Sequence, residues 1–243
     1  MTMTPIGANL VRIKEEIEAV CRKVGRHPQE IRLVAVSKGC STTTIKEVYQ
    51  AGQSLFAESR VQELTRKITA LPPEIAWHFI GTLQRNKVKK IVGKVVLIHS
   101  VDSFSLAEEI SRQAQGQKRT AALLLQVNIA GEKNKHGFTP LEIKERIREI
   151  GQLPHIRVKG LMTMAPLVEN PEDVRSVFRE LRFLAMDLRR SAESGMALDE
   201  LSMGMSNDFR VAIEEGATLV RLGSKVFNTE NREGGNQENE GIG

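Results

Sequence analysis

Cysteine and aromatic residues are scarce in this sequence. Cys21 and Cys40 are the only thiols among 243 residues, and they lack metal-ligand spacing, which argues against a disulfide framework and against a zinc site. Aromatic residues make up 4%, with one Trp and one Tyr, so few rings are available to stack on nucleic-acid bases. We therefore expect a chemically reduced protein that does not bind nucleic acid, although its net charge of +5 permits an anionic ligand.

Long apolar runs are also missing. No stretch approaches the roughly 20 apolar residues that a membrane-spanning helix needs. The N-terminal sequence MTMTPIGANLVRIKEEIEAVCRK lacks the basic start, apolar centre and cleavage site of a signal peptide. The densest basic run, 85–90, alternates with apolar residues at helical spacing, and we interpret it as a solvated helix face. We expect a cytoplasmic protein that does not associate with membranes.

What the sequence does contain is a regular alternation of strand-like and helix-like segments. Such an alternation predicts parallel strands joined by right-handed crossovers. Eight strands in a chain of this length favour a single α/β domain, a (β/α)8 TIM barrel, over a doubly wound open sheet. The strands are expected at 31–37, 54–58, 76–81, 95–100, 121–128, 156–162, 198–202 and 218–222, with helices at 42–51, 60–70, 84–92, 104–116, 139–151, 171–193 and 207–216.

Two further segments flank this alternation. An extra helix is expected at about 6–26, before the first strand. The last residues, 229–243, are rich in Gly, Asn and Glu and nearly devoid of apolar side chains. Such a segment buries too little to offset the entropy of ordering, so we expect a disordered tail after a barrel domain at 1–228.

The last two strands end in small and hydroxyl-bearing residues. In TIM barrels the active site lies at the C-terminal ends of the strands, and the loops after strands 7 and 8 frequently bind phosphate. Here Met203, Gly204 and Ser206 follow the seventh strand, and Gly223 and Ser224 follow the eighth. We expect the segment from Gly204 to open a helix whose free N–H groups favour an anion. Tight turns alone would explain either glycine, but the two loops together favour a phosphate site.

Lys38 directly follows the apolar run of the first strand. It shares strand parity with Val34 and Val36, so its amine lies over the barrel mouth if those side chains face the lumen. A lysine in an apolar mouth can act as a Schiff-base nucleophile, whereas a solvated lysine at the start of a loop is the simpler interpretation. Lysine opposite a phosphate site fits an aldolase-like enzyme on a sugar phosphate, or a protein that holds pyridoxal phosphate.

Two other polar residues have an open interpretation. Arg221 precedes Gly223, where a cofactor ring reaching from a phosphate to the lysine would pass, and a guanidinium there would keep a pyridine nitrogen unprotonated. A salt bridge from Arg221 to Glu200 or Asp208 is the alternative. His78 lies in an apolar stretch, where a packed core histidine and a cofactor neighbour are both consistent with the sequence.

Seven motifs in order, VAVSKG, FAESRVQE, WHFIGTLQRNK, IHSVDS, GLMTMAP, LSMGMSND and VRLGSKVF, resemble those of the pyridoxal-phosphate homeostasis proteins, small barrels akin to the N-terminal domain of alanine racemase. The resemblance runs from about 8 to 228. It implies a fold-type III barrel with pyridoxal 5'-phosphate as a Schiff base on Lys38. It also implies phosphate contacts around Ser206, Gly223 and Ser224, with Arg221 near the ring nitrogen.

The sequence departs from the family pattern in two motifs. Ala57 and Ser59 replace the Gly and Asn of the commoner FGENYVQE, and Thr82 replaces the second His of WHFIGHLQ. These changes affect the flanks of the cofactor ring, where Ser59 and His78 are expected, and leave Lys38 and the phosphate loops unchanged.

A racemase would need acid/base groups on both faces of the ring. In alanine racemases, which this barrel resembles, a tyrosine from an additional β domain serves one face. The only tyrosine here, Tyr49, falls in the helix after the first strand. We therefore expect a monomeric protein without catalytic turnover that holds, buffers or delivers the cofactor in vitamin B6 and amino/keto-acid homeostasis, with PLP-dependent apoenzymes as possible recipients. A racemase or decarboxylase of narrow scope and a cofactor-free aldolase are the alternatives.

Overall fold

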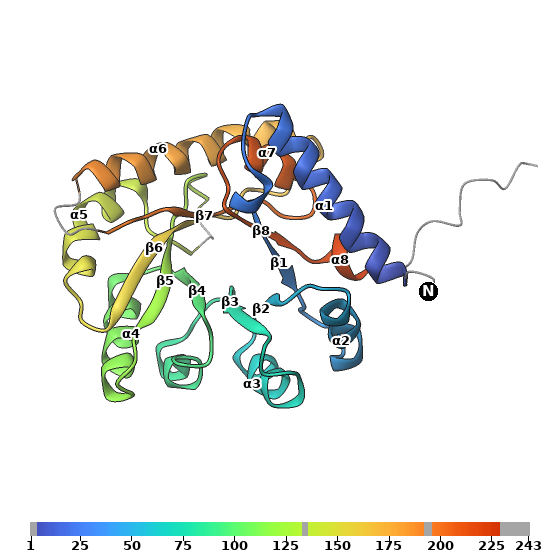
Figure 1. The fold of residues 1–243 in the computed structure, drawn as a ribbon. Coiled ribbons are helices and arrows are strands. Elements are labelled where there is room, and N and C mark those ends of the chain that lie inside the picture. The colour runs from blue at the N-terminus through green and yellow to red at the C-terminus, as the bar shows by residue number, and fades with distance from the viewer. Residues whose placement is uncertain (1–3, 133–135, 192–195, 229–243) are drawn as a thin grey trace, which may run out of the picture.

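Eight parallel strands form a closed barrel in the computed structural model, which describes residues 4–132, 136–191 and 196–228 (Figure 1). Each strand pairs with the next in the chain, and the (β/α)8 class predicted from the sequence is confirmed. The strands are β1 (Arg32–Val36), β2 (Leu55–Glu58), β3 (Ala76–Phe79), β4 (Leu97–Val101), β5 (Ala121–Gln126), β6 (Ile156–Met162), β7 (Glu200–Ser202) and β8 (Leu219–Leu222). The tail expected at 229–243 lies outside the described residues.

Helices surround the barrel (Figure 1). The extra N-terminal helix, α1, begins after Thr4, whose hydroxyl accepts the N–H of Gly7, and its apolar face packs against α7 and α8. The helices are α1 (Pro5–Lys23), α2 (Thr42–Gln50), α3 (Val61–Ala70), α4 (Phe104–Gly116), α5 (Pro140–Gly151), α6 (Arg175–Ser191), α7 (Phe209–Glu214) and α8 (Ser224–Phe227), with 3-10 turns η1 (Pro28–Glu30), η2 (Arg85–Lys90) and η3 (Pro171–Val174).

Two helical segments differ from the sequence prediction. The basic run forms the 3-10 helix η2 instead of an α-helix, and only its apolar Val88 is buried. The helix after β7 does not open at Gly204, because residues 206–208 form a turn and α7 begins at Phe209. The Asp208 carboxylate accepts the N–H of Met205 at 2.6 Å and closes that turn.

The core has two layers. The larger layer lies between the strands and the helices. The smaller one fills the barrel lumen and consists of Val34, Ala57, Leu97, Leu124, Met162 and Leu219. Because side chains alternate along a strand, Val34 in the lumen also turns Lys38 to the lumen side, as the parity argument requires.

Gly160 permits the close pairing of β6 with β7. A Cβ atom at this position would lie 1.8 Å from the backbone oxygen of Glu200. We therefore expect Gly160→Ala to lower the free energy of unfolding by about 1–3 kcal/mol, since the sheet would have to open. Urea unfolding measures this loss. Gly116→Ala is the control, because a Cβ there has no neighbour within 4 Å; equal stabilities of the two variants would contradict the expectation.

Candidate ligand site at the barrel mouth

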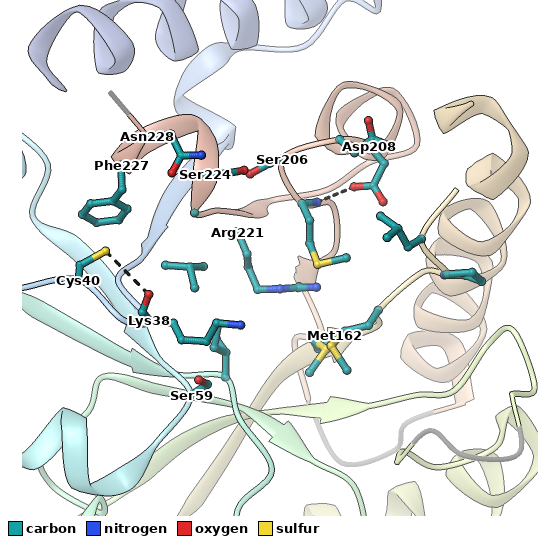
Figure 2. Close-up of a pocket in the computed structure, with 18 of the residues that line it drawn as sticks. Lys38, Cys40, Ser59, Met162, Ser206, Asp208, Arg221, Ser224, Phe227 and Asn228 are labelled. Atoms are coloured by element: carbon teal, nitrogen blue, oxygen red, sulfur yellow. Dashed lines mark hydrogen bonds between the residues drawn. The ribbon is translucent and has the colours of Figure 1, made fainter. Parts of the chain in front are cut away.

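A pocket of about 660 Å³ opens at the C-terminal ends of the strands. Such cavities are the usual ligand sites of this fold. Figure 2 shows residues from both ends of the chain around it. The polar and sulfur-bearing lining comes from Lys38, Cys40, Ser59, Met162, Met164, Met205, Ser206, Asn207, Asp208, Arg221, Ser224 and Asn228, and the rest from Val36, Ile80, Pro166, Leu167, Val168, Gly223 and Phe227.

A tight turn between β1 and α2 places Lys38 in the pocket. The N–H of Cys40 donates to the carbonyl oxygen of Ser37 at 3.0 Å, and Gly39 has a φ of +76°. These features match a type II turn with Lys38 and glycine as its two central residues. The Lys38 side chain is exposed and points into the pocket (Figure 2). The turn thus explains why an amine follows a buried strand at this point.

The loops after β7 and β8 form another side of the pocket. Ser206 and Ser224 present hydroxyls there (Figure 2). Gly223 lies at the start of α8. The first N–H groups of a helix have no acceptor within it. The side chain of Asp208 also lines this side, and burial raises the pKa of its carboxyl. Hydroxyls and N–H donors in this arrangement suit a phosphate group.

Arg221 lies between Lys38 and the β7 loop (Figure 2). Its guanidinium is buried and donates to Ser202 Oγ at 2.6 Å and to the carbonyl of Thr163 at 2.9 Å. Burial lowers the pKa of Arg221 to about 10, so the side chain stays charged at neutral pH. Among the described residues, neither of the salt bridges considered for Arg221 is formed: Glu200 pairs with Arg32, and the Asp208 carboxylate accepts the N–H of Met205. A fixed donor therefore faces the pocket.

Two neutral histidines continue this network across the lumen. His99 contacts Ser202 Oγ through Nδ1 at 2.8 Å and His78 Nδ1 through Nε2 at 2.8 Å. Burial lowers the pKa of His78 to about 3 and that of His99 well below its usual range. This series of hydrogen-bonded side chains links β3, β4, β7 and β8 behind Arg221. It gives the guanidinium a fixed orientation.

The structure brings together most of the predicted site residues. Lys38, Ser59, Ser206, Arg221, Gly223 and Ser224 line one pocket. Met203 packs in the outer core, and Gly204, with a φ of +91°, supports the bend of the loop. His78 lies behind Arg221 in the lumen network instead of on the pocket wall.

Sequence reasoning missed three members of this network. Ser202 ends β7, Thr163 follows β6 and His99 lies in the middle of β4, but nothing local indicates that they meet Arg221 and His78. The bond from His99 on β4 to Ser202 on β7 joins strands that are not neighbours in the sheet. Only the closed barrel brings them together.

The chemistry of the lining restricts the kinds of ligand. Among the described residues, no cluster of three or more His, Cys, Asp and Glu side chains could hold a metal ion. In the same part of the chain, none of the helices is both long and apolar enough to cross a bilayer. An amine, a buried cation and hydroxyl-bearing loops instead suit a phosphorylated carbonyl compound. A barrel protein that binds such a compound at its mouth is the class that fold and site define.

The comparisons with known proteins agree with this class. Residues 8–230 match the family described as alanine racemase, N-terminal domain. A pyridoxal phosphate homeostasis protein of Aquifex aeolicus is 47% identical over 219 residues, covering 90% of this chain and 95% of the relative. One from Escherichia coli is 34% identical, covering 93% and 97%. The chain therefore belongs to the alanine racemase N-terminal domain family and, within it, to the pyridoxal phosphate homeostasis proteins, which confirms the resemblance seen in the motifs.

Solved structures show the same relationship. The chain is 36% identical to PipY of Synechococcus elongatus with PLP bound, with a TM-score of 0.77, covering 88% of this chain and 100% of PipY. PipY without PLP superimposes with a TM-score of 0.81 at 38% identity, covering 89% and 100%. An alanine racemase of Clostridium difficile has a TM-score of 0.74 at 15% identity, covering 91% of this chain and 56% of the racemase. The last likeness shows the fold alone.

Proposed function

We propose that this protein holds pyridoxal 5'-phosphate as a Schiff base on Lys38 and serves the homeostasis of this cofactor without catalytic turnover. The observation that carries the proposal is the pocket itself, in which Lys38, Arg221 and the serine-bearing loops after β7 and β8 converge. The names of the relatives and the PLP-bound PipY structure support it. PLP supplies an aldehyde, which condenses with a primary amine and releases water.

Each side of the pocket would then have its own task. Ser206, Gly223 and Ser224 bind the phosphate through hydroxyl and backbone donors. Arg221 donates toward the pyridine nitrogen and, being charged, keeps that nitrogen unprotonated, which weakens the ring as an electron sink. Ser59 lies on the flank of the ring.

The absence of turnover is inferred from the titratable groups at the pocket. Among the described residues that line it, these are Lys38, Cys40, Asp208 and Arg221. Asp208 is engaged with Met205 N–H, and Arg221 with Ser202 and Thr163. Tyr49 lies on α2 and packs against the outer core, so it offers no acid on the second face of the ring. We expect a cytoplasmic monomer that exchanges its cofactor with apoenzymes.

The test is a visible absorption spectrum of protein purified without added cofactor, followed by borohydride reduction and peptide mapping. A visible band that bleaches, with the pyridoxyl group on Lys38, is the expected result, because reduction makes the C–N linkage permanent. Protein that remains colourless and takes up no added PLP would contradict the proposal. A reducible adduct formed only with a sugar phosphate would favour the aldolase instead.

A further inference from the structure

A buried ion pair lies on the outer side of the barrel wall, behind Lys38. Glu58 ends β2 and Lys67 lies in α3, with exposed side-chain fractions of 0% and 1%. Their contact, from Lys67 Nζ to Glu58 Oε1, is 2.5 Å. Lys67 lies three residues after Leu64 and four before Leu71, which places it beside the apolar face of α3. A lysine that is fully buried there needs a specific partner for its charge.

The pair is attached to the turn that carries Lys38. Lys67 Nζ donates to the carbonyl oxygen of Ser37 at 2.8 Å, and Ser37 Oγ donates to Glu58 Oε1 at 2.6 Å. The same Ser37 carbonyl accepts the N–H of Cys40, the bond that closes the turn. The Lys67 ammonium group therefore binds the same carbonyl oxygen that accepts the hydrogen bond closing the turn.

Strand parity explains why these contacts lie behind Lys38 and not in the pocket. Ala35 packs in the outer core and Val34 in the lumen. Ser37 therefore points outward, toward α3, while Lys38 points inward to the mouth. The two residues flank one peptide group, so a constraint on the Ser37 carbonyl is transmitted directly to the backbone of Lys38.

The pair is a poor device for stability alone. Desolvation of two charges often exceeds the gain from their attraction, and apolar replacements of such pairs are frequently neutral or stabilising. In addition, Glu58 Oε2 is buried and has no hydrogen-bond partner within the described structure, which adds a further cost. Because the pair costs folding free energy and is also hydrogen-bonded to the turn, its role is to position the turn.

We propose that Lys67 is a positioning residue that, with Glu58 as its counter-ion, fixes the Ser37–Cys40 turn so that Lys38 Nζ is presented to the carbonyl carbon of the ligand. This inference rests on the proposed function for its chemical readout. Lysine nitrogen attacks the aldehyde carbon, a C=N bond replaces C=O, and water leaves. The contacts of Lys67 with the Ser37 carbonyl and with Glu58, here called the clamp, take no part in these bond changes. The clamp fixes the position from which the amine attacks.

The obvious variant, Lys67→Met, would leave Glu58 buried without a counter-ion and could unfold the protein. The variant used is therefore Glu58→Gln with Lys67→Met, in which the amide oxygen introduced at position 58 still accepts from Ser37 Oγ. The matched control is Lys144→Met, which removes a lysine from an exposed pair with Asp187 on the outer helices. Glu58→Gln alone keeps the donation from Lys67 to the Ser37 carbonyl, and the Glu63 carboxylate, 3.8 Å from Lys67 Nζ, remains as a counter-ion for the buried ammonium.

Two quantities are compared between the variants and the wild type. The rate of covalent PLP capture is measured by stopped flow, and the affinity for an analogue without the aldehyde is measured by titration. Covalent capture of PLP, followed by absorbance and by reduction, should slow at least about 10-fold in the double variant and stay unchanged in Lys144→Met. Affinity for 4'-deoxypyridoxine 5'-phosphate, which lacks the aldehyde, should change less than about 2-fold, because the phosphate loops are untouched. Glu58→Gln should remain close to the wild type in both.

Equal capture rates in the double variant and the wild type would overturn the proposal. So would a matching loss of affinity for the aldehyde-free analogue, which would indicate a general disturbance of the pocket, or slowing by Glu58→Gln alone. Hydrogen exchange of the Cys40 amide gives a readout without cofactor: it should accelerate in the double variant. If wild-type protein captures no PLP, the proposed function fails, whereas faster Cys40 exchange still supports the clamp and unchanged exchange overturns it.

Discussion

Lys38→Ala is expected to abolish covalent attachment of pyridoxal 5'-phosphate while leaving the barrel folded. Lys38 is the lysine among the described residues that line the mouth pocket, and without its amine no C=N bond to the protein can form there. Stability should change by no more than about 0.5 kcal/mol, because the side chain is exposed and the turn is closed by Ser37, Gly39 and Cys40.

The measurement is the visible spectrum and the reduced peptide map of the variant after incubation with the cofactor. Lys46→Ala is the control, an exposed lysine on α2 outside the pocket, and it should retain the full band. Phosphate binding by Lys38→Ala should persist, since the loops after β7 and β8 are unaltered. A reducible adduct that survives on another lysine of the variant would contradict the site assignment.

The second large effect is a loss of stability in mild acid. Burial lowers the pKa of His78 to about 3, and burial, with His78 and the charge of Arg221 close by, lowers the pKa of His99. Unfolding restores an ordinary pKa of about 6.5. Below that pH the histidines bind protons in the unfolded chain but stay neutral in the folded one. The free energy of unfolding therefore falls as the pH drops from about 6.5 toward the pKa values of the folded state.

The linkage relation gives the size of this effect. At pH 5 each histidine that must stay neutral costs about 2 kcal/mol relative to pH 7.5, so the pair costs about 4 kcal/mol. Urea unfolding at the two pH values measures it. His99→Gln, which can still bridge Ser202 and His78, should lose about 2 kcal/mol less between these pH values than the wild type does. The same pH dependence in both proteins would show that His99 is already charged when folded.

The fold could be read from the sequence because its signals are local and repeated. Most strands of the barrel are apolar runs followed by a helical pattern, and all eight were predicted within a few residues. The convergence of Lys38 with the loops at Ser206 and Ser224 was also predictable, since parallel strands bring their C-terminal ends to one rim.

The rest depends on contacts that local patterns do not encode. The histidine network joins β4 to β7 across the lumen. Helical spacing places Lys67 beside the apolar face of α3, but it does not show that Glu58 and the Ser37 carbonyl are its partners. The helix α7 begins later than predicted because the carboxylate of Asp208 accepts the N–H of Met205 and forms a turn there. In each case a side chain three or more residues away decides the outcome, which periodicity cannot show.

The closure of β1 against β8 has a consequence for biosynthesis. In that register Val34 lies opposite Arg221, so the rim that bears Lys38 is completed only by the eighth strand, which is synthesised long after the first. A nascent chain that already carries the amine has neither the guanidinium nor the loop at Ser224. Cofactor capture in the proposed mode therefore has to wait until β8 has been synthesised and has closed the barrel, and a chain truncated before β8 could not hold the cofactor.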